Sequence, residues 1–205
     1  MSKPEQRPYH HGNLREELLE AGMKMLETTG ARDLSLRELS RELGVSHTAP
    51  RRHFPDKQAL LDALALHGFA LLGVAIAKAL KDRSLDFKTR LVKLGRAYVG
   101  FAVKHPALLS MMFAAKHHDD APAELLAAAE RAFAPSSLAF EDGQAAGDVI
   151  PGDSKDLSLL AFTAMQGLVS LSHNGIFRGE KIDLLIGGIL EHLILGLKPR
   201  KEPAR

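Results

Sequence analysis

Residues 34–57, LSLRELSRELGVSHTAPRRHFPDK, decide the fold, because they hold two short helix patterns, a glycine turn and a local excess of positive charge. The first helix has one apolar face, made by leucines at helical spacing: Leu36, Leu39 and Leu43. Gly44 suits the left-handed backbone at which helices commonly end. Ser46 is placed to cap a second helix, in which Pro50 removes only one early hydrogen bond. The stretch therefore predicts a helix-turn-helix.

The second predicted helix carries almost nothing large and apolar before Phe54, so its outer face must meet water or a polar partner. Its residue types suit the major groove of DNA, where arginine binds guanine or phosphate and the methyl groups of threonine and alanine contact thymine. A solvated surface helix is the alternative that composition leaves open, but the order of helix, glycine turn and polar helix favours DNA. The predicted DNA-binding residues are Arg37, Ser46, His47, Thr48, Ala49, Arg51, Arg52, His53 and Lys57.

The order of residues in this stretch is also similar to that of a known family. Residues 35–39, 44–46 and 53–61 resemble the DNA-binding domain of the tetracycline-repressor-like (TetR) family of bacterial regulators. Residues 9–14, YHHGNL, resemble the entry into the first helix of one large branch of that family. The family usually has tyrosine where this chain has Arg51, at a position that typically touches the DNA backbone.

The resemblance implies more than the residues alone would predict. Members of the family are dimers whose second domain usually binds a small effector and changes the spacing of the DNA-binding halves in response. The helix that begins at Lys57 would connect the two domains. In such a dimer the two recognition helices would lie about 34 Å apart, or a little more, to read an inverted-repeat operator.

Composition and charge limit the function classes. The formal net charge of the 205 residues is only +2, so affinity for nucleic acid must come from where the charges lie. The absence of cysteine excludes disulfides and thiolate chemistry and fits a cytoplasmic protein. No apolar signal-peptide region follows the polar N-terminus, and no run of about 18 apolar residues predicts a membrane span.

The layout predicts an all-α protein, with a three-helix DNA-binding domain followed by a larger helical domain for effector binding and dimerisation. The predicted divisions are a flexible arm at 1–12, the DNA-binding domain at 13–56, the second domain at 57–197 and a disordered basic tail at 198–205. Asn13, Asp56 and Ser154 are placed as helix N-caps, and Gly30 ends the first helix. The helices between are predicted over 57–80, 87–104, 106–115, 123–133 and 138–147, with a break at the proline and serines of 135–137.

The last two predicted helices, one capped by Ser154 and one over 182–197, carry more apolar surface than one core stripe needs. They also contain small residues that permit close approach of another helix: Gly167, Gly187 and Gly188. Residues of the earlier of the two helices that we expect to be buried are Leu157, Leu160, Phe162, Ala164, Gly167, Leu168 and Leu171. A second copy of the same pair would cover this surplus, which predicts a homodimer with two-fold symmetry. The alternative is that both helices lie centrally in the domain.

The search for catalytic chemistry finds no motif, so we predict neither catalytic residues nor a cofactor. The best metal candidate is His117-His118-Asp119-Asp120, with His105 as a further ligand. Adjacent histidines on a helix point about 100° apart and do not easily share an ion, so a polar linker is the preferred interpretation. A metal-dependent enzyme that uses the His117 region remains the unfavoured alternative.

A ligand cavity in the second domain is the remaining hypothesis. Adaptable apolar side chains and a few polar groups could line it, and the candidates are Tyr98, Phe101, Met111, Phe113, Phe162, Met165 and Gln166. Because buried charge is scarce, the effector is expected to be neutral or hydrophobic. We interpret the chain as a dimeric repressor of this kind. A regulator of the same fold without an effector, or an activator, is the alternative.

Overall fold

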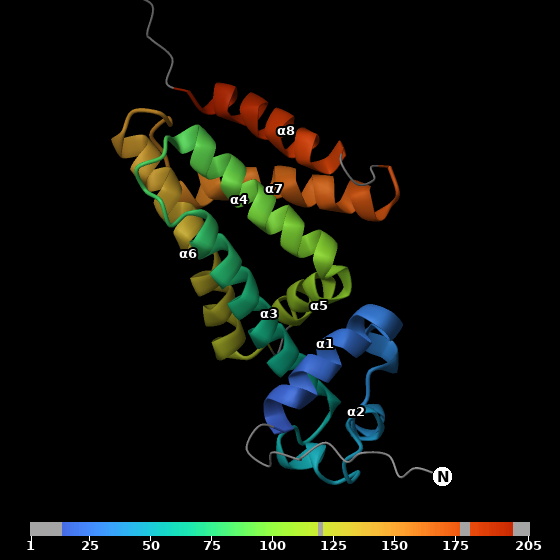
Figure 1. Ribbon diagram of the computed structural model, residues 1–205. Helices are drawn as coiled ribbons and strands as arrows, with labels where there is room; N and C mark the ends of the chain where they lie inside the picture. The colour runs from blue at the N-terminus through green and yellow to red at the C-terminus, as the bar shows by residue number, and fades with distance from the viewer. Residues whose placement is uncertain (1–13, 119–120, 177–180, 199–205) are drawn as a thin grey trace, which may run out of the picture.

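The computed structural model describes residues 14–118, 121–176 and 181–198, and throughout this part of the chain the regular elements are helices (Figure 1). They are α1 (Leu14–Asp33), α2 (Leu36–Leu43), the short 3-10 helix η1 (Pro50–Arg52), α3 (Lys57–Ala79), α4 (Phe87–Lys104), α5 (Pro106–Lys116), α6 (Ala123–Ala145), α7 (Ser154–His173) and α8 (Lys181–Leu197). The all-α prediction is confirmed. The predicted arm at 1–12, the cap at Asn13 and nearly all of the tail at 198–205 lie outside the described residues.

The first domain is a small unit of α1, α2 and the segment around η1 at one end of the molecule (Figure 1). Its core consists of fully buried side chains, Leu18, Leu26, Leu34, Leu39 and Phe54. Gly30 interrupts α1 with φ 79°, and Gly44 ends α2 in the left-handed conformation with φ 66°. Both glycines therefore act where the sequence predicted a helix end.

The second helix of the predicted motif is not an α-helix. The Ala49 N–H donates to the Ser46 carbonyl at 3.0 Å, so the chain turns by i→i+3 bonds and continues into the 3-10 helix η1. Pro50 has no N–H with which to extend an α-helical ladder back to Ser46, and its ring is buried. Ser46 does not cap a backbone N–H; its Oγ lies 3.3 Å from Thr48 Oγ1. The prediction that the helix survives Pro50 was wrong.

Helix α3 is the spine that joins the two domains (Figure 1). Asp56 caps it as predicted, accepting the Ala59 N–H at 2.8 Å, and the helix ends before the predicted break at 81–84. Although no membrane span was predicted, α3 is long and apolar enough to cross a membrane by length and composition alone. Several of its large side chains, among them Phe69, Leu72 and Ile76, are fully buried, as in a core helix, although Leu71 and Val74 are exposed.

Helix α6 runs unbroken from Ala123 to Ala145 with Pro135 inside it, so the predicted break at 135–137 was wrong. The helix lies along α3, where its alanines Ala128, Ala129 and Ala132 are buried. The approach is close, since a Cβ on Gly73 of α3 would lie 3.2 Å from the Ala132 Cα. This packing holds the half of α6 before Pro135 firmly against α3.

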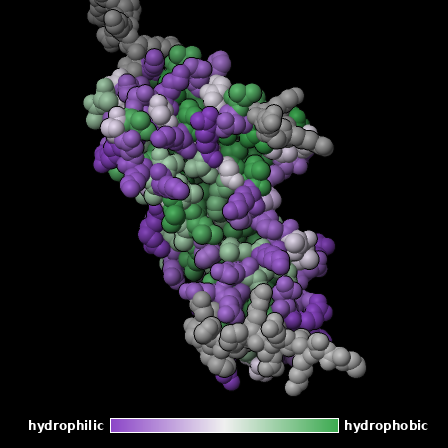
Figure 2. Space-filling view, viewed as in Figure 1, coloured by the Kyte–Doolittle hydropathy of each residue, from purple (hydrophilic) through white to green (hydrophobic). Residues whose placement is uncertain are grey.

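Helices α7 and α8 lie at the end of the molecule away from the first domain (Figure 1). Asp153 caps α7 by accepting the Lys155 N–H at 2.7 Å, one residue earlier than predicted, because the Ser154 hydroxyl donates to Glu141 instead. In the single chain Leu160, Gly167 and Leu171 are exposed, contrary to the prediction that they are buried. The large hydrophobic residues that are exposed in the described chain all lie from Leu71 onwards, and Figure 2 shows apolar surface over the second domain.

Candidate DNA-binding surface and ligand cavity

The predicted DNA-binding side chains lie on the surface of the first domain. Arg37 on α2 is exposed, and so are Ser46, His47, Thr48, Arg51, Arg52 and His53; Ala49 and Lys57 are half-buried. Arg37, Arg51 and Arg52 make no ion pair with any residue that the structure describes. These guanidinium groups are therefore free to meet phosphates or base edges.

Lys57 has a second role that the sequence did not reveal. Its Nζ donates to the Arg32 carbonyl at 2.8 Å, which ties the start of α3 to the end of α1. A lysine ammonium has three donors, so this bond leaves two for another acceptor. The N-terminus of α3 nearby adds the positive end of a helix dipole. Lys57 thus supports the domain and still presents charge beside residues 46–53, the predicted recognition segment.

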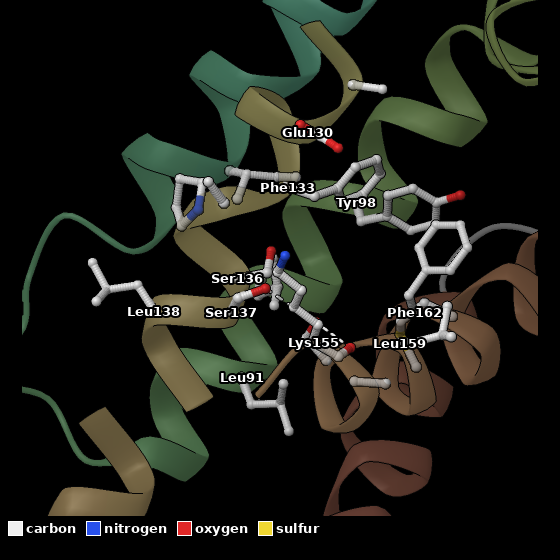
Figure 3. Close-up of a pocket in the computed structure, with 18 of the residues that line it drawn as sticks. Leu91, Tyr98, Glu130, Phe133, Ser136, Ser137, Leu138, Lys155, Leu159 and Phe162 are labelled. Atoms are coloured by element: carbon white, nitrogen blue, oxygen red, sulfur yellow. Dashed lines mark hydrogen bonds between the residues drawn. The ribbon is translucent and has the colours of Figure 1, made fainter. Parts of the chain in front are cut away.

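The second domain contains a cavity of about 1040 Å³, lined mainly by α4, α6 and α7 (Figure 3). Its apolar side is an aromatic cluster of four rings, Tyr98, Phe113, Phe133 and Phe162. Ring centroids lie 5.3 Å apart for Tyr98 and Phe162, 5.5 Å for Phe133 and Phe162, and 5.8 Å for Phe113 and Phe162. A cavity of this size with aromatic walls and a few polar groups is typical of small-molecule sites.

The predicted cavity residues divide into two sets. Tyr98, Phe113, Phe162 and Met165 line the cavity, whereas Phe101, Met111 and Gln166 do not. The Phe101 ring lies against His105 at 5.1 Å, and Met111 is buried elsewhere in the core. Placing these two in the cavity was wrong, because the periodicity of a helix buried on several sides does not tell which side meets the cavity.

Gln166 does not line the cavity but contacts a residue that does. Its side-chain oxygen accepts a hydrogen bond from the Tyr98 hydroxyl. Burial raises the pKa of Tyr98 well above its ordinary value, so this hydroxyl stays protonated and remains a donor. The bond fixes the ring of Tyr98, which then offers the cavity an apolar surface.

Several lining residues were not predicted. They include Leu91, Phe133, Ser136, Ser137, Lys155 and Leu159, and Figure 3 shows them around the same space. The only sequence signal for the serines was the Pro-Ser-Ser run, which was interpreted as a helix break. A continuous α6 instead places these polar residues on a wall of the cavity.

A helix cap also joins the two domains. The Glu27 carboxylate on α1 accepts the backbone N–H groups of Ala107 and Leu108, each at 3.0 Å. These are the first free donors of α5, so a side chain of the DNA-binding domain caps a helix of the second domain. Since Phe113 on the same helix lines the cavity, α5 lies between the cavity and the DNA-binding domain.

A buried ion pair joins α4 to the far half of α6. Arg90 is almost fully buried and its Nη1 lies 2.9 Å from Asp142 Oδ2, while Arg83 pairs with the other carboxylate oxygen. Burial would raise the pKa of Asp142, but hydrogen bonds from Arg83 and Arg90 outweigh it and lower the pKa. The pair fastens α6 beyond Pro135.

Where the structure describes the chain, no group of three or more His, Asp or Glu side chains gathers in a way that could hold a metal ion. Of the candidate metal residues, Asp119 and Asp120 lie outside the described residues, and His117 ends α5 on the surface.

An exposed helix-turn-helix surface joined to a helical domain that contains a cavity defines a DNA-binding regulator of the helix-turn-helix class. Residues 18–64 match the family model described as bacterial regulatory proteins, tetR family, and residues 91–194 match the one described as tetracyclin repressor-like, C-terminal domain. The chain belongs to the TetR family of bacterial transcriptional regulators.

Three similar proteins show how far the likeness extends. A protein of unknown function from Rhodococcus sp. RHA1 is 38% identical, with a TM-score of 0.87 over 95% of this chain and 100% of that one. The TetR-family regulator PfmR from Thermus thermophilus shares the fold, with 19% identity and a TM-score of 0.68 over 89% of this chain and 99% of that one. The nucleoid occlusion factor SlmA of Pectobacterium carotovorum is 35% identical over 102 residues, which are 49% of this chain and 50% of that protein. The chain spans about half the length of the curated relatives it matches.

Proposed function

We propose that this regulator is a cytoplasmic homodimer that represses transcription by binding an inverted-repeat operator, and that a small molecule in the cavity releases it. It acts by binding and not by catalysis. The single observation that carries the proposal is the pairing of an exposed, unpaired set of arginines on the helix-turn-helix with a cavity of about 1040 Å³ in the second domain. A filled core between α4, α6 and α7 would have favoured a regulator without an effector.

The surface of α7 and α8 supports the dimer. On α7 the exposed stripe Leu160, Gly167 and Leu171 follows helical spacing, and Leu184 and Leu195 are 78% and 61% exposed on α8. A Cβ at Gly167 or Gly188 would meet nothing within 4 Å, so each glycine leaves open space in the single chain. Exposed leucines around small residues suit a helix of a second copy that packs closely against them.

The hydrogen bonds between Glu27 and the N-terminus of α5 support a route by which ligand binding could reach the DNA-binding domain. A ligand that moved the ring of Phe113 would act on α5, whose N-terminus is held by Glu27 of α1. Helix α3 provides a second path, because it begins beside the recognition segment and its Ile76 lines the cavity. Either path would change the distance between the two recognition segments of a dimer, and so the fit to half-sites one turn of DNA apart.

Selection of DNA from a random pool by the purified protein tests the DNA-binding part. We expect enrichment of an inverted repeat whose half-sites are centred about 10 base pairs, or a little more, apart. The variant Thr48→Ala should alter the enriched sequence without weakening binding to DNA in general, because Thr48 is predicted to contact bases. Recovery of a single half-site, or of no sequence at all, would contradict the proposal.

Glycine variants test the dimer separately. Gly167→Gln should convert the protein to a monomer in light-scattering measurements while its melting temperature stays near that of the parent, since the single chain has room for the side chain. Gly100→Gln is the matched control, because Gly100 on α4 is equally open and lies outside the proposed interface. A dimer that persists in Gly167→Gln would move the interface elsewhere.

A reporter gene behind the selected operator distinguishes repression from activation. We expect transcription to fall when the protein is supplied and to recover when a cavity ligand is added. Transcription that rises with the protein would show an activator.

A further inference from the structure

The polar side of the cavity contains a serine hydroxyl that has no hydrogen-bond partner among the described residues. Ser136 is 6% exposed and lines the cavity, yet its hydroxyl makes no hydrogen bond within the part of the chain that the structure describes. The Ser136 oxygen is not among the buried side-chain atoms that lack a partner, so it borders the open space of the cavity. The hydroxyl of Ser136 is therefore available to a ligand, as a donor or an acceptor.

A second polar group on the same wall comes from the proline within α6. Pro135 has no N–H, so the carbonyl of Arg131, four residues earlier, lacks its usual helical donor. Arg131, Pro135 and Leu138 all line the cavity, which places this turn of α6 on the cavity side. We therefore take the Arg131 carbonyl, which has lost its helical donor on a turn of α6 that lines the cavity, as the acceptor for a ligand.

The charges around this wall do not favour an ion of either sign. The side chain of Lys155 points toward Ser136 and Ser137 (Figure 3), which by itself would suit an anion. The lining contains three cationic residues, Lys116, Arg131 and Lys155, and three acidic ones, Glu130, Glu141 and Asp156. All of them are exposed except Lys116, which is half-buried. The cavity therefore has no net charge, and its polar interior consists of serine hydroxyls, Ser137 and Ser158 lying 3.4 Å apart.

The apolar part of the lining is the aromatic cluster of Tyr98, Phe113, Phe133 and Phe162. Because the Tyr98 hydroxyl is already bonded to Gln166, this side offers ring surfaces and no free polar group of its own. Edges and faces of rings at these separations suit another aromatic ring or a similarly large apolar body.

We propose that the ligand of this cavity is an uncharged molecule with an aromatic or comparably large apolar body and one hydroxyl or primary amide. The body packs on the aromatic cluster. The polar group accepts a hydrogen bond from Ser136 and donates one to the Arg131 carbonyl, so it must both donate and accept. This inference rests on the proposed role of the cavity as the effector site, and it names the chemistry of the effector.

A matched series of para-substituted biphenyls tests the proposal: biphenylmethanol, methylbiphenyl, biphenylcarboxylate and biphenylmethylammonium. Each competes with a neutral naphthylamine dye whose fluorescence rises in apolar surroundings. We expect biphenylmethanol to bind about tenfold more tightly than methylbiphenyl, because its hydroxyl forms the two hydrogen bonds, to Ser136 and to the Arg131 carbonyl, at the cost of leaving water. Tightest binding by the carboxylate or by the ammonium compound would overturn the proposal, as would failure of biphenylmethanol to displace the dye.

Two variants test the polar wall, and neither relies on loss of the fold. Ser136→Ala should remove most of the preference for biphenylmethanol while methylbiphenyl binds as before. Ser110→Ala is the matched control, because Ser110 is exposed on α5 and does not line the cavity. Pro135→Ala restores the donor to the Arg131 carbonyl, so it should weaken binding of the alcohol even as the melting temperature rises. An unchanged preference in Ser136→Ala would contradict the role of this hydroxyl.

The ligand chemistry and the proposed function can fail separately. The binding series uses the protein without DNA, and its outcome does not depend on regulation. If biphenylmethanol binds with the expected preference but leaves operator binding unchanged, the ligand class stands and release by an effector is contradicted. If operator binding is released by a charged biphenyl instead, the proposed function stands and the ligand class is overturned.

Discussion

Two prolines, Pro50 and Pro135, each interrupt a helical pattern in the sequence, and the structure reverses the prediction at both: the helix predicted to survive Pro50 is lost, and the helix predicted to break at Pro135 continues. Around Pro50 the chain gives up the α-helix and continues through a turn and a 3-10 helix of three residues. Around Pro135 the α-helix continues, and α6 spans 23 residues. The residue type is the same in both places, so the local chemistry does not explain the difference.

The difference lies in the contacts that each segment makes with the rest of the protein. The recognition segment has few contacts, because most of its side chains face solvent, where DNA is expected. Helix α6 is fastened on both sides of Pro135, by its buried alanines against α3 and by Asp142 bonded to Arg83 and Arg90. Packing over a long helix outweighs one missing hydrogen bond, and a short exposed segment has no such support.

The largest expected effect comes from loosening α6 beyond Pro135. Arg90→Ala should lower the free energy of unfolding by about 3 kcal/mol, because it leaves the partly buried Asp142 with one partner. Chemical denaturation measures this. Arg83→Ala is the control, since Arg83 is 60% exposed and its pair with the same carboxylate is worth at most about 1 kcal/mol. Equal losses of unfolding free energy in Arg90→Ala and Arg83→Ala would contradict the claim that the buried arginine contributes more to stability than the exposed one.

The same ion pair predicts a pH dependence. The lowered pKa of Asp142 means that its stabilising contribution is complete above the ordinary aspartate pKa of about 3.9 and is lost as the pH falls through the lowered value. The stability difference between the parent and Arg90→Ala should therefore shrink in acid.

Restoring the hydrogen bond inside α6 should have the next largest effect. Pro135→Ala is expected to raise the free energy of unfolding by about 2 kcal/mol, which is the helix penalty of proline less the entropy that proline removes from the unfolded chain. Thermal and chemical unfolding measure the gain. A loss of stability would show that α6 is built around the proline ring.

The contact between Glu27 on α1 and the N-terminus of α5 predicts a smaller change in stability. Glu27→Gln should lower the free energy of unfolding by about 1 kcal/mol, because the carboxylate cap of α5 loses its charge and one of its acceptors. Hydrogen exchange at Ala107 and Leu108 should become faster. Glu20→Gln, at an exposed site on α1, is the control and should change neither quantity.

Pro50→Ala should have the smallest effect on stability, a change below about 1 kcal/mol, since a regained hydrogen bond and a lost buried ring oppose each other. Denaturation of Pro50→Ala beside Pro135→Ala compares the two prolines directly. A gain as large as that of Pro135→Ala would contradict the difference in support between the two regions.

Local signals in the sequence predicted most of the helices. Gly44, Asp56 and Pro106 mark helix ends by backbone chemistry that acts within a few residues, and the structure confirms each. The cavity was predictable only in part, because its walls come from helices far apart in the chain. Tyr98 and Phe162 were found as large residues on apolar helices, whereas Ser136 and Lys155 carry no local sign that a cavity faces them.

The measurement that tests the central claim most directly is the salt dependence of operator affinity for the parent and for Arg51→Tyr. If Ser46 to His53 meets DNA, replacing the exposed, unpaired Arg51 removes one phosphate contact from each subunit. The negative slope of log affinity against log salt should then become less steep by about two for a dimer. Equal slopes for the two proteins would contradict the placement of this segment on DNA.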